Sequence, residues 1–285
     1  MMEKYYCFAD IGLEVSIPNG QMYTDDLQLK NFRTDRLPEP HRFFFRTVEA
    51  LEPPAGPALA SLPGSRVYDA GEGYVRCYGT VDAPYIRAEH RGMDHNVTIL
   101  RQYAPQRISA RLVLNALDAE HLVAQSGGLI LHASFIGWQG KAVLFTAPSE
   151  TGKTTQAELW KAHRNARIIN GDRAVILGRS DGVYAAGLPF AGSSRYCENE
   201  TLPLAAVVYL RQGKRTVIRR LKGVEAFRKI WEGCCVNTWH REDMQNVSAL
   251  VQRLAEDTAV YELVCTPDES AVLALEQQLR KQVEQ

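Results

Sequence analysis

The chain has 285 residues, of which 45% are hydrophobic and 23% charged, a composition that is typical of a folded globular protein and argues against long disordered segments. Its 33 basic and 33 acidic residues give a formal net charge of zero, so bulk attraction to nucleic acid or to an anionic membrane is not expected. No stretch is apolar enough to span a membrane, and the first residues lack the apolar core of a secretory signal. We therefore expect a cytoplasmic protein with reduced cysteines and with neither a membrane nor a nucleic-acid partner.

Short apolar and aromatic runs separated by turn signals predict a β-rich N-terminal region over residues 1–105. The expected strands are Tyr5–Val15, Phe43–Val48, Tyr74–Tyr78, Tyr85–Ala88 and Val97–Tyr103. Prolines lack the amide donor that a helix or a central strand needs, so the stretch from Pro53 to Gly64 is expected to be an exposed loop.

The pattern of residues 106–285 is that of an α/β nucleotide-binding domain, because strands alternate with helices. Apolar residues at helical spacing from Ile108 to Ala119 predict a helix that stops at Gly127-Gly128. Two apolar strands and then a helix follow, at Leu129–Ile136, Ala142–Thr146 and about Gly152–His163, with the turn Gly137–Gly140 between the strands. Further strands are predicted at Arg167–Ile169, Ala174–Leu177, Val183–Ala186, Ala205–Leu210, Thr216–Leu221 and Val260–Val264. Further helices are predicted at Val224–Trp231, Arg241–Ala255 and Asp268–Gln282.

Residues Ala147 to Thr155 match the phosphate-loop pattern A/G-x-x-x-x-G-K-S/T, between a predicted strand and a predicted helix. In such a loop the main-chain amides and the helix N-terminus bind a triphosphate, the lysine (Lys153) reaches the β- and γ-phosphates, and the hydroxyl of Thr154 coordinates Mg²⁺. ATP and Mg²⁺ are therefore the expected ligands, and the alternative is an ordinary turn between a strand and a helix. The predicted nucleotide-binding residues are Ser149, Glu150, Thr151, Gly152, Lys153, Thr154 and Thr155.

Two residues outside this loop are candidates for catalysis. Asp172 follows a predicted buried strand, where a carboxylate beside a phosphate loop would hold Mg²⁺ or accept a proton. The alternative for Asp172 is a residue chosen for the geometry of the Asn170-Gly171 turn. His132 lies in an apolar strand, and a histidine with apolar neighbours is more often a core residue with a satisfied hydrogen bond.

A third candidate segment is Gly192-Ser193-Ser194-Arg195, whose amides, hydroxyls and guanidinium could bind an anionic group of a substrate. Its alternative is a plain connecting loop. Cys234-Cys235 with His240 invites a metal-site interpretation, but adjacent cysteines rarely ligate one zinc ion, so no structural zinc is expected there.

The segment from about Gly128 to Ile176 resembles the HPr kinase/phosphorylase family, whose P-loop core is similar to that of ATP-dependent phosphoenolpyruvate carboxykinase. The residues that carry the resemblance are Leu131-His132, the Gly137–Gly140 turn, the Ser149–Thr155 loop and Asp172-Arg173, and Gly187–Ser194 looks like a loop of uncharacterised HPr-kinase-like proteins. The resemblance implies a mixed-sheet α/β kinase core and a homo-oligomer. It also implies that His132 and Asp172 take part in catalysis and that Gly152, Lys153 and Thr154 bind the nucleotide. The family's paired aspartates are Gly171-Asp172 here.

The main functional hypothesis is an ATP- and Mg²⁺-dependent kinase that phosphorylates a hydroxyl, that of Ser or Thr in a protein or peptide. A second is a small-molecule kinase, for which a closed polar pocket near Ser193–Arg195 would be expected. A third belongs to another class, a nucleotide-binding regulatory protein without turnover. The carboxylate of Glu150 near the phosphates and the single aspartate at Asp172 favour that third hypothesis.

Overall fold

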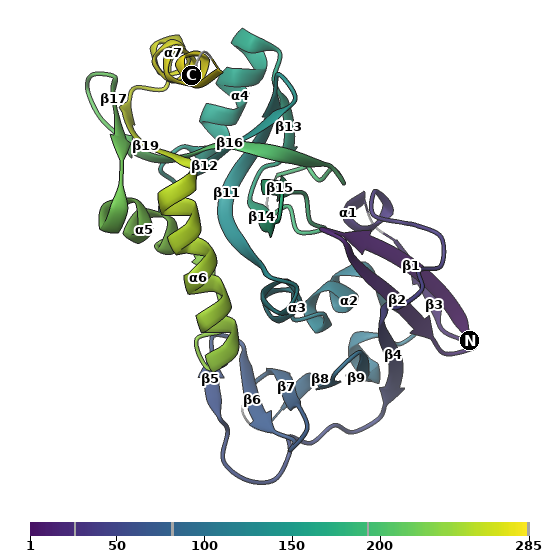
Figure 1. Ribbon diagram of the computed structural model, residues 1–285. Helices are drawn as coiled ribbons and strands as arrows, with labels where there is room; N and C mark the ends of the chain where they lie inside the picture. The colour runs from purple at the N-terminus through teal and green to yellow at the C-terminus, as the bar shows by residue number, and fades with distance from the viewer. Residues whose placement is uncertain (26, 81–82, 193, 284–285) are drawn as a thin grey trace. The chain divides into compact units, whose positions relative to one another are not determined.

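The computed structural model describes residues 1–283 except 26, 81, 82 and 193. The chain forms two compact units, Met1–Ala119 and Glu120–Gln285 (Figure 1). Large mixed sheets and, in the part of the chain that is described, seven α-helices make the fold mixed α/β. The division falls after Ala119, later than residue 105, because helix α2 (Ala110–Ala116) contacts strand β8 (Pro84–Arg91) of the first unit.

The first unit is built on an eight-stranded sheet in the order β1-β2-β4-β9-β8-β7-β6-β5. Strand β4 pairs in parallel with β2 and β9, and the other pairs are antiparallel. The bounds are β1 Met2–Phe8, β2 Ile11–Ile17, β4 His41–Val48, β5 Ala60–Leu62, β6 Ser65–Asp69, β7 Tyr74–Gly79, β8 Pro84–Arg91 and β9 Asp94–Leu100. A second, two-stranded sheet pairs β3 (Met22–Thr24) with β10 (Arg107–Ser109), and α1 covers Leu27–Lys30.

Two strand predictions and one loop prediction for this unit need correction. The expected strand Tyr5–Val15 is a hairpin, with Ala9 at φ 49° and Asp10 at φ 66° in a two-residue turn. Two positive φ values suit such a turn, but its dipeptide is Ala9-Asp10 and not the Asn-Gly that usually indicates a two-residue hairpin turn in a sequence. The expected strand Val97–Tyr103 ends at Leu100, where a 3₁₀ turn begins. The expected loop from Pro53 to Gly64 contains strand β5.

The single helix expected after Pro105 is also wrong, because the chain breaks at Asp118. Strand β10 comes first, then α2 and α3 (Ala119–Gln125), with Asp118 between the helices at φ 48°. The buried carboxylate of Asp118 accepts hydrogen bonds from the hydroxyl of Tyr74 at 2.8 Å and from the guanidinium of Arg76 at 2.9 Å. These long-range bonds hold Asp118 out of the helix. The periodicity of apolar residues does not reveal such bonds, so the break could not be predicted from it.

In the second unit the sheet follows the order β12-β11-β14-β15-β16-β19-β17, and β13 and β18 pair with β11 at its two halves. Strand β16 also pairs in parallel with β12 and β19, so three parallel strands lie side by side. The strand bounds are β11 Gly128–Trp138, β12 Lys141–Thr146, β13 Arg167–Asn170, β14 Arg173–Arg179, β15 Gly182–Ala186, β16 Thr201–Gln212, β17 Val217–Leu221, β18 Cys234–Cys235 and β19 Ala259–Cys265. The strands predicted after Gly128 are confirmed with ends shifted by a few residues, and only the short β18 was not predicted.

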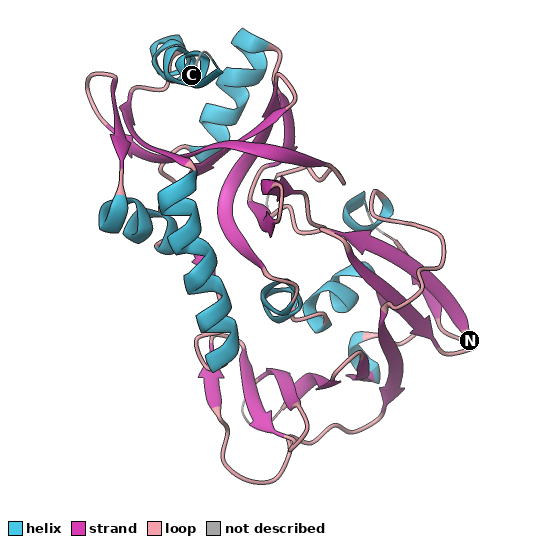
Figure 2. Cartoon of the chain, viewed as in Figure 1, coloured by secondary structure: helices cyan, strands magenta, loops and turns pink. Residues whose placement is uncertain are grey.

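Helices cover both faces of the parallel strands of the second unit (Figure 2). On β12 the side chains alternate, so Val143 and Phe145 pack with α4 and α7, whereas Leu144 packs with α5 and α6 on the other face. The helix bounds are α4 Lys153–Arg164, α5 Gly223–Trp231, α6 Arg241–Asp257 and α7 Glu269–Val283. Among the helices of the described residues, none has both the length and the apolarity needed to cross a lipid bilayer.

Candidate functional site

The phosphate-loop motif joins the end of β12 to the first residue of α4, as the sequence predicts. Strand β12 ends at Thr146 and α4 begins at Lys153. Two positions of the loop take the left-handed conformation, Gly152 at φ 113° and Glu150 at φ 62°. Glycine adopts such angles without a steric cost, whereas glutamate adopts them with strain. The amides of the first turn of α4 therefore point back toward the loop, the geometry in which a helix N-terminus binds anions.

The ammonium group of Lys153 lies inside the curve of this loop. Its Nζ donates hydrogen bonds to the main-chain oxygens of Ala147 at 3.1 Å and Pro148 at 3.3 Å. The side chain is buried, and burial lowers the pKa of Lys153 while the nearby charge of Asp172 opposes that shift. A buried cation that donates to carbonyl oxygens is well placed to exchange them for the oxygens of a phosphate.

Asp172 lies between two basic side chains. Its Oδ1 is 3.4 Å from Nε2 of His132, and its Oδ2 is 3.4 Å from Nε of Arg173. The register of the sheet explains this contact, because His132 on β11 is paired with Arg173 on β14. Hydrogen bonding to His132 lowers the pKa of Asp172, burial opposes the shift, and the charges of Arg173 and Lys153 lower the pKa further. Asp172 is therefore a carboxylate at neutral pH.

Sequence reasoning missed the residue that holds Asp172 in place, Asn170 at the end of β13. Its fully buried side chain accepts hydrogen bonds through Oδ1 from the amides of Asp172 at 2.9 Å and Arg173 at 3.0 Å. Its Nδ2 donates to the main-chain oxygens of Leu188 at 3.1 Å and Phe190 at 3.0 Å. The sequence marks Asn170-Gly171 as a turn, and the position of an asparagine at the buried end of a strand is the signal for this second role.

Two glycines let the loop after β15 approach Asp172 closely. A Cβ at Gly192 would lie 2.6 Å from Cγ of Asp172, and Gly192 has a φ of 55°. A Cβ at Gly171 would lie 2.4 Å from the side chain of Ser194. The hydroxyl of Ser134 donates to the oxygen of Gly171 at 3.0 Å and fixes the same turn from the other side.

A cavity of about 410 Å³ brings most of the predicted site residues together. Its lining comprises His132, Ser149, Glu150, Gly152, Lys153, Thr154, Thr155, Gly171, Asp172 and Ser194. Among the other predicted residues, Arg195 is exposed and is not part of this lining in the described chain, and Ser193 lies outside the described residues. The cavity wall therefore combines a helix N-terminus, a buried ammonium group and a carboxylate.

A second cavity of about 420 Å³ adjoins the same loop, and the sequence did not indicate it. It shares Glu150, Gly152 and Thr155 with the first cavity and also contains Thr151. The rest of its lining is Gln156, Leu210, Arg211, Gln212, Gly213, Cys265 and Pro267. The end of β16 forms part of its wall, where the side-chain amide of Gln212 donates to the main-chain oxygen of Thr151 at 3.4 Å.

The oxygen atoms in the first cavity fit a hard divalent cation. Mg²⁺ prefers carboxylate, hydroxyl and phosphate oxygens. Thr154, exposed on the first turn of α4, and the half-buried Asp172 both line this cavity. These are the two residues that the sequence predicts as ligands of Mg²⁺.

Comparisons with known proteins identify one family. The family model described as "SynChlorMet cassette protein ScmC" matches residues 112–266, which is more than half of the chain. No curated protein matches. Among solved structures, the chain is similar to the Hpr(Ser) kinase/phosphatase from Coxiella burnetii, with 11% sequence identity and a TM-score of 0.34. That match covers 54% of this chain and 89% of the other.

Proposed function

We propose a function for this chain, which belongs to the SynChlorMet cassette protein ScmC family: it transfers the γ-phosphoryl group of ATP to a hydroxyl group. The observation that carries the proposal is that Lys153, the N-terminus of α4 and Asp172 line one cavity. Phosphoryl transfer requires these three elements, a cation and amides for the phosphates and a carboxylate for the attacking hydroxyl. The proposed acceptor is a Ser or Thr hydroxyl of a protein or peptide.

The two cavities that share the loop would divide the nucleotide between them. The triphosphate would lie in the first cavity, where Lys153 exchanges its bonds to the oxygens of Ala147 and Pro148 for bonds to phosphate. The nucleoside would lie in the second, against the end of β16, where Gln212 and Arg211 offer polar groups to a base or a ribose. Thr154 and Asp172 would hold Mg²⁺, which neutralises charge on the phosphates when it is bound.

The proton of the acceptor hydroxyl would go to Asp172. As the bond from the acceptor oxygen to the γ-phosphorus forms, the bond from that phosphorus to the bridging oxygen of ATP breaks, and ADP leaves. His132 orients the carboxylate from 3.4 Å and keeps its second oxygen directed toward Arg173. The lowered pKa of Asp172 makes it a weak base, which suits a transition state in which the hydroxyl proton is released late.

One observation favours a second candidate, nucleotide binding without turnover. Glu150 is exposed and lines both cavities, so its carboxylate adds negative charge where phosphates would bind. A like charge near the triphosphate weakens binding and would suit a site that only senses nucleotide. The two candidates differ in whether ADP is produced.

Isothermal titration with MgATP, followed by transfer from γ-labelled ATP to a mixture of Ser/Thr peptides, tests the proposal. We expect Lys153→Ala to abolish binding, and Lys161→Ala, on the exposed face of the same helix, to bind like the wild type. Asp172→Asn should weaken MgATP binding less than Lys153→Ala does and should lose about 100-fold or more of its turnover. A folded wild-type protein that does not bind MgATP would refute the proposal, and full turnover by Asp172→Asn would remove the assigned base. Binding without production of ADP by the wild type would favour the second candidate.

A further inference from the structure

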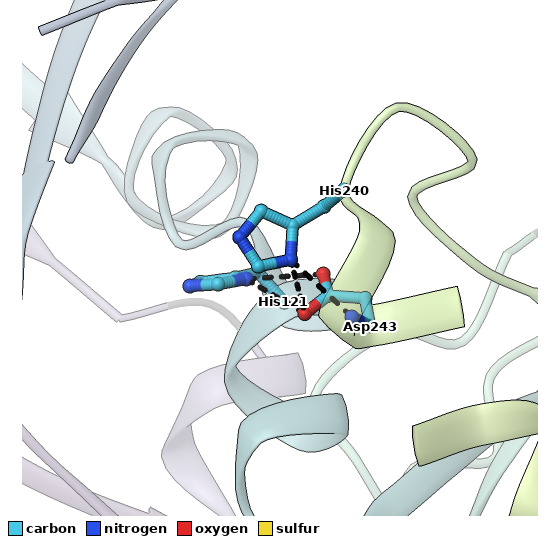
Figure 3. Close-up of side chains that lie close together, drawn as sticks. All are labelled: His121, His240 and Asp243. Carbon is cyan, nitrogen blue, oxygen red and sulfur yellow. Dashed lines mark hydrogen bonds and ion pairs between the residues drawn. The ribbon is translucent and has the colours of Figure 1, made fainter. Parts of the chain in front are cut away.

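A cluster of two histidines and one aspartate lies outside the nucleotide cavities in the second unit. His121 comes from α3, His240 precedes α6, and Asp243 lies in the first turn of α6 (Figure 3). One nitrogen of each ring points at the carboxylate of Asp243. Nδ1 of His121 lies 3.1 Å and 3.0 Å from the two carboxylate oxygens, and Nδ1 of His240 lies 3.0 Å from Oδ1.

We propose that His121, His240 and Asp243 form a binding site for a transition-metal ion of the Zn²⁺ class. Each residue offers one ligand atom, and these atoms all lie within 4.8 Å of one another. Around tetrahedral Zn²⁺, with bonds of about 2.0–2.2 Å, neighbouring ligand atoms are about 3.4 Å apart. Small rotations of the two rings are therefore enough to admit the ion. Two imidazoles select Zn²⁺ over Mg²⁺ and Ca²⁺, which prefer oxygen ligands.

Asp243 is buried and held by a hydrogen bond from a neighbouring side chain, as metal ligands commonly are. Its side chain is fully buried, although an isolated buried carboxylate is costly. Gln125, one turn after His121 on α3, donates Nε2 to Oδ1 of Asp243 at 2.9 Å and fixes the carboxylate. Such outer-shell hydrogen bonds orient metal ligands and contribute to affinity.

The two histidines leave the site open on one side. Their side chains are 19% and 27% exposed, so an ion can reach the buried carboxylate from solvent. Three protein ligands leave the fourth tetrahedral position to water or to a bound molecule. The site would also join α3 to α6, whose ligands are 122 residues apart in the sequence. His240, which lies near Cys234-Cys235 in the sequence, is thus a proposed metal ligand, but its partners are His121 and Asp243 and not the cysteines.

The main competitor is a cluster held by protons alone. Nδ1 of His240 also lies 3.3 Å from the amide of Asp243, which it caps. A single nitrogen cannot both accept from this amide and donate to Oδ1, so the two contacts make opposite demands on its protonation. A proton on Nδ1 would donate to Oδ1 and release the amide, and a metal ion on Nδ1 would draw Oδ1 toward itself and release the amide likewise. Direct measurement of Zn²⁺ binding separates the two cases.

The test is Zn²⁺ titration of the chelator-treated, full-length protein against a chromophoric chelator, with Co²⁺ absorption as a second readout. We expect one Zn²⁺ per chain, and no comparable binding of Mg²⁺. His121→Ala and His240→Ser should each weaken Zn²⁺ binding by about 100-fold or more, since even outer-shell changes cost 10- to 100-fold. Serine at 240 retains a good N-cap for α6, so folding is preserved. Gln125→Ala should weaken binding less.

Two controls identify the ligands. His163→Gln removes a histidine that also lies near a carboxylate, that of Glu269 at 3.6 Å, and should leave Zn²⁺ affinity unchanged. The double variant Cys234→Ser, Cys235→Ser should bind Zn²⁺ like the wild type. Absence of Zn²⁺ binding by the folded wild type would overturn the proposal. So would binding that is lost with the cysteines and kept in His121→Ala.

Discussion

The side-chain oxygen of Asn170 accepts a hydrogen bond from the amide of Asp172 at 2.9 Å, and this bond sets the position of the candidate catalytic carboxylate. The same buried side chain also bonds the amide of Arg173 and the oxygens of Leu188 and Phe190. Asn170 therefore joins the turn that carries Asp172 to the loop after β15. Asn170 thus positions the candidate site although it does not line either of the two cavities.

Replacing Asn170 by alanine should destabilise the protein and disturb the site together. The amides of Asp172 and Arg173 and the oxygen of Phe190 would lose the bond to Asn170, whereas the oxygen of Leu188 keeps the amide of Phe190 as a donor. Buried unsatisfied groups cost about 1–3 kcal/mol each, so we expect a loss of at least about 2–3 kcal/mol. Asn246→Ala is a matched control, because its half-buried amide makes one bond, to the oxygen of Ala124 at 3.2 Å. Urea unfolding of both variants checks the prediction, and equal losses would show that Asn170 has no special role.

The close approach of Gly192 to Asp172 gives a second prediction. Gly192→Ala would combine strain at a positive φ with a Cβ 2.6 Å from the carboxylate carbon. Gly140→Ala has a similar φ, 73°, but open space around its Cβ, so it isolates the backbone cost of about 1–2 kcal/mol.

We expect Gly192→Ala to lose about 1–3 kcal/mol more stability than Gly140→Ala, the usual cost of overpacking. It should also lower turnover at least tenfold, because the added methyl displaces Asp172. Denaturant unfolding and peptide phosphorylation measure the two effects. A Gly192→Ala protein that is less stable but has unchanged turnover would show that the position of Asp172 does not affect the reaction.

The sequence predicted the second unit better than the first, for a physical reason. Its central strands are buried on both faces and its helices have long apolar stripes, so patterns such as Ala142–Thr146 stand out locally. The turn at Ala9-Asp10 and the helix break at Asp118 depend on angles and on distant partners that leave no local signal. The same limit applies to the candidate site. Spacing around Lys153 identified the loop, but the second cavity and the grouping of His121 with Asp243 exist only in three dimensions.

The charge of Glu150 should oppose nucleotide binding. Its exposed carboxylate lines both cavities, and two unit charges about 4 Å apart in water interact by about 1 kcal/mol. Glu150→Gln keeps the length of the side chain and removes the charge, so MgATP should bind about fivefold more tightly. Glu158→Gln, on the exposed face of α4, should change the affinity little.

Salt provides the check on this mechanism. The difference between Glu150→Gln and the wild type should shrink in calorimetric titrations as ionic strength rises, since salt screens exposed charges. An improvement that does not depend on salt would point to the left-handed backbone at residue 150 as its source.

Replacing Lys153 should raise the stability of the protein and abolish its binding of MgATP. Burial lowers the pKa of its ammonium group below the usual 10.5. Between the folded pKa and 10.5 the unfolded chain binds more protons than the folded chain, so the wild type gains stability as pH rises through that window. At pH 7–8 the buried charge therefore destabilises the ligand-free protein. Lys153→Met removes the charge and keeps the volume, so it should raise Tm by about 2 °C while it abolishes MgATP binding.

Thermal unfolding from pH 7.5 to 10.5 checks both the sign and the cause. The advantage of Lys153→Met should decrease with rising pH, because the lysine of the folded wild type then loses the charge whose burial is costly. Lys161→Met, on the exposed face of α4, should show no such convergence. A Lys153→Met protein that is less stable than the wild type at pH 7.5 would mean that the bonds from Nζ to the oxygens of Ala147 and Pro148 outweigh the cost of burial. The ammonium group would then be a structural part of the loop before any nucleotide arrives.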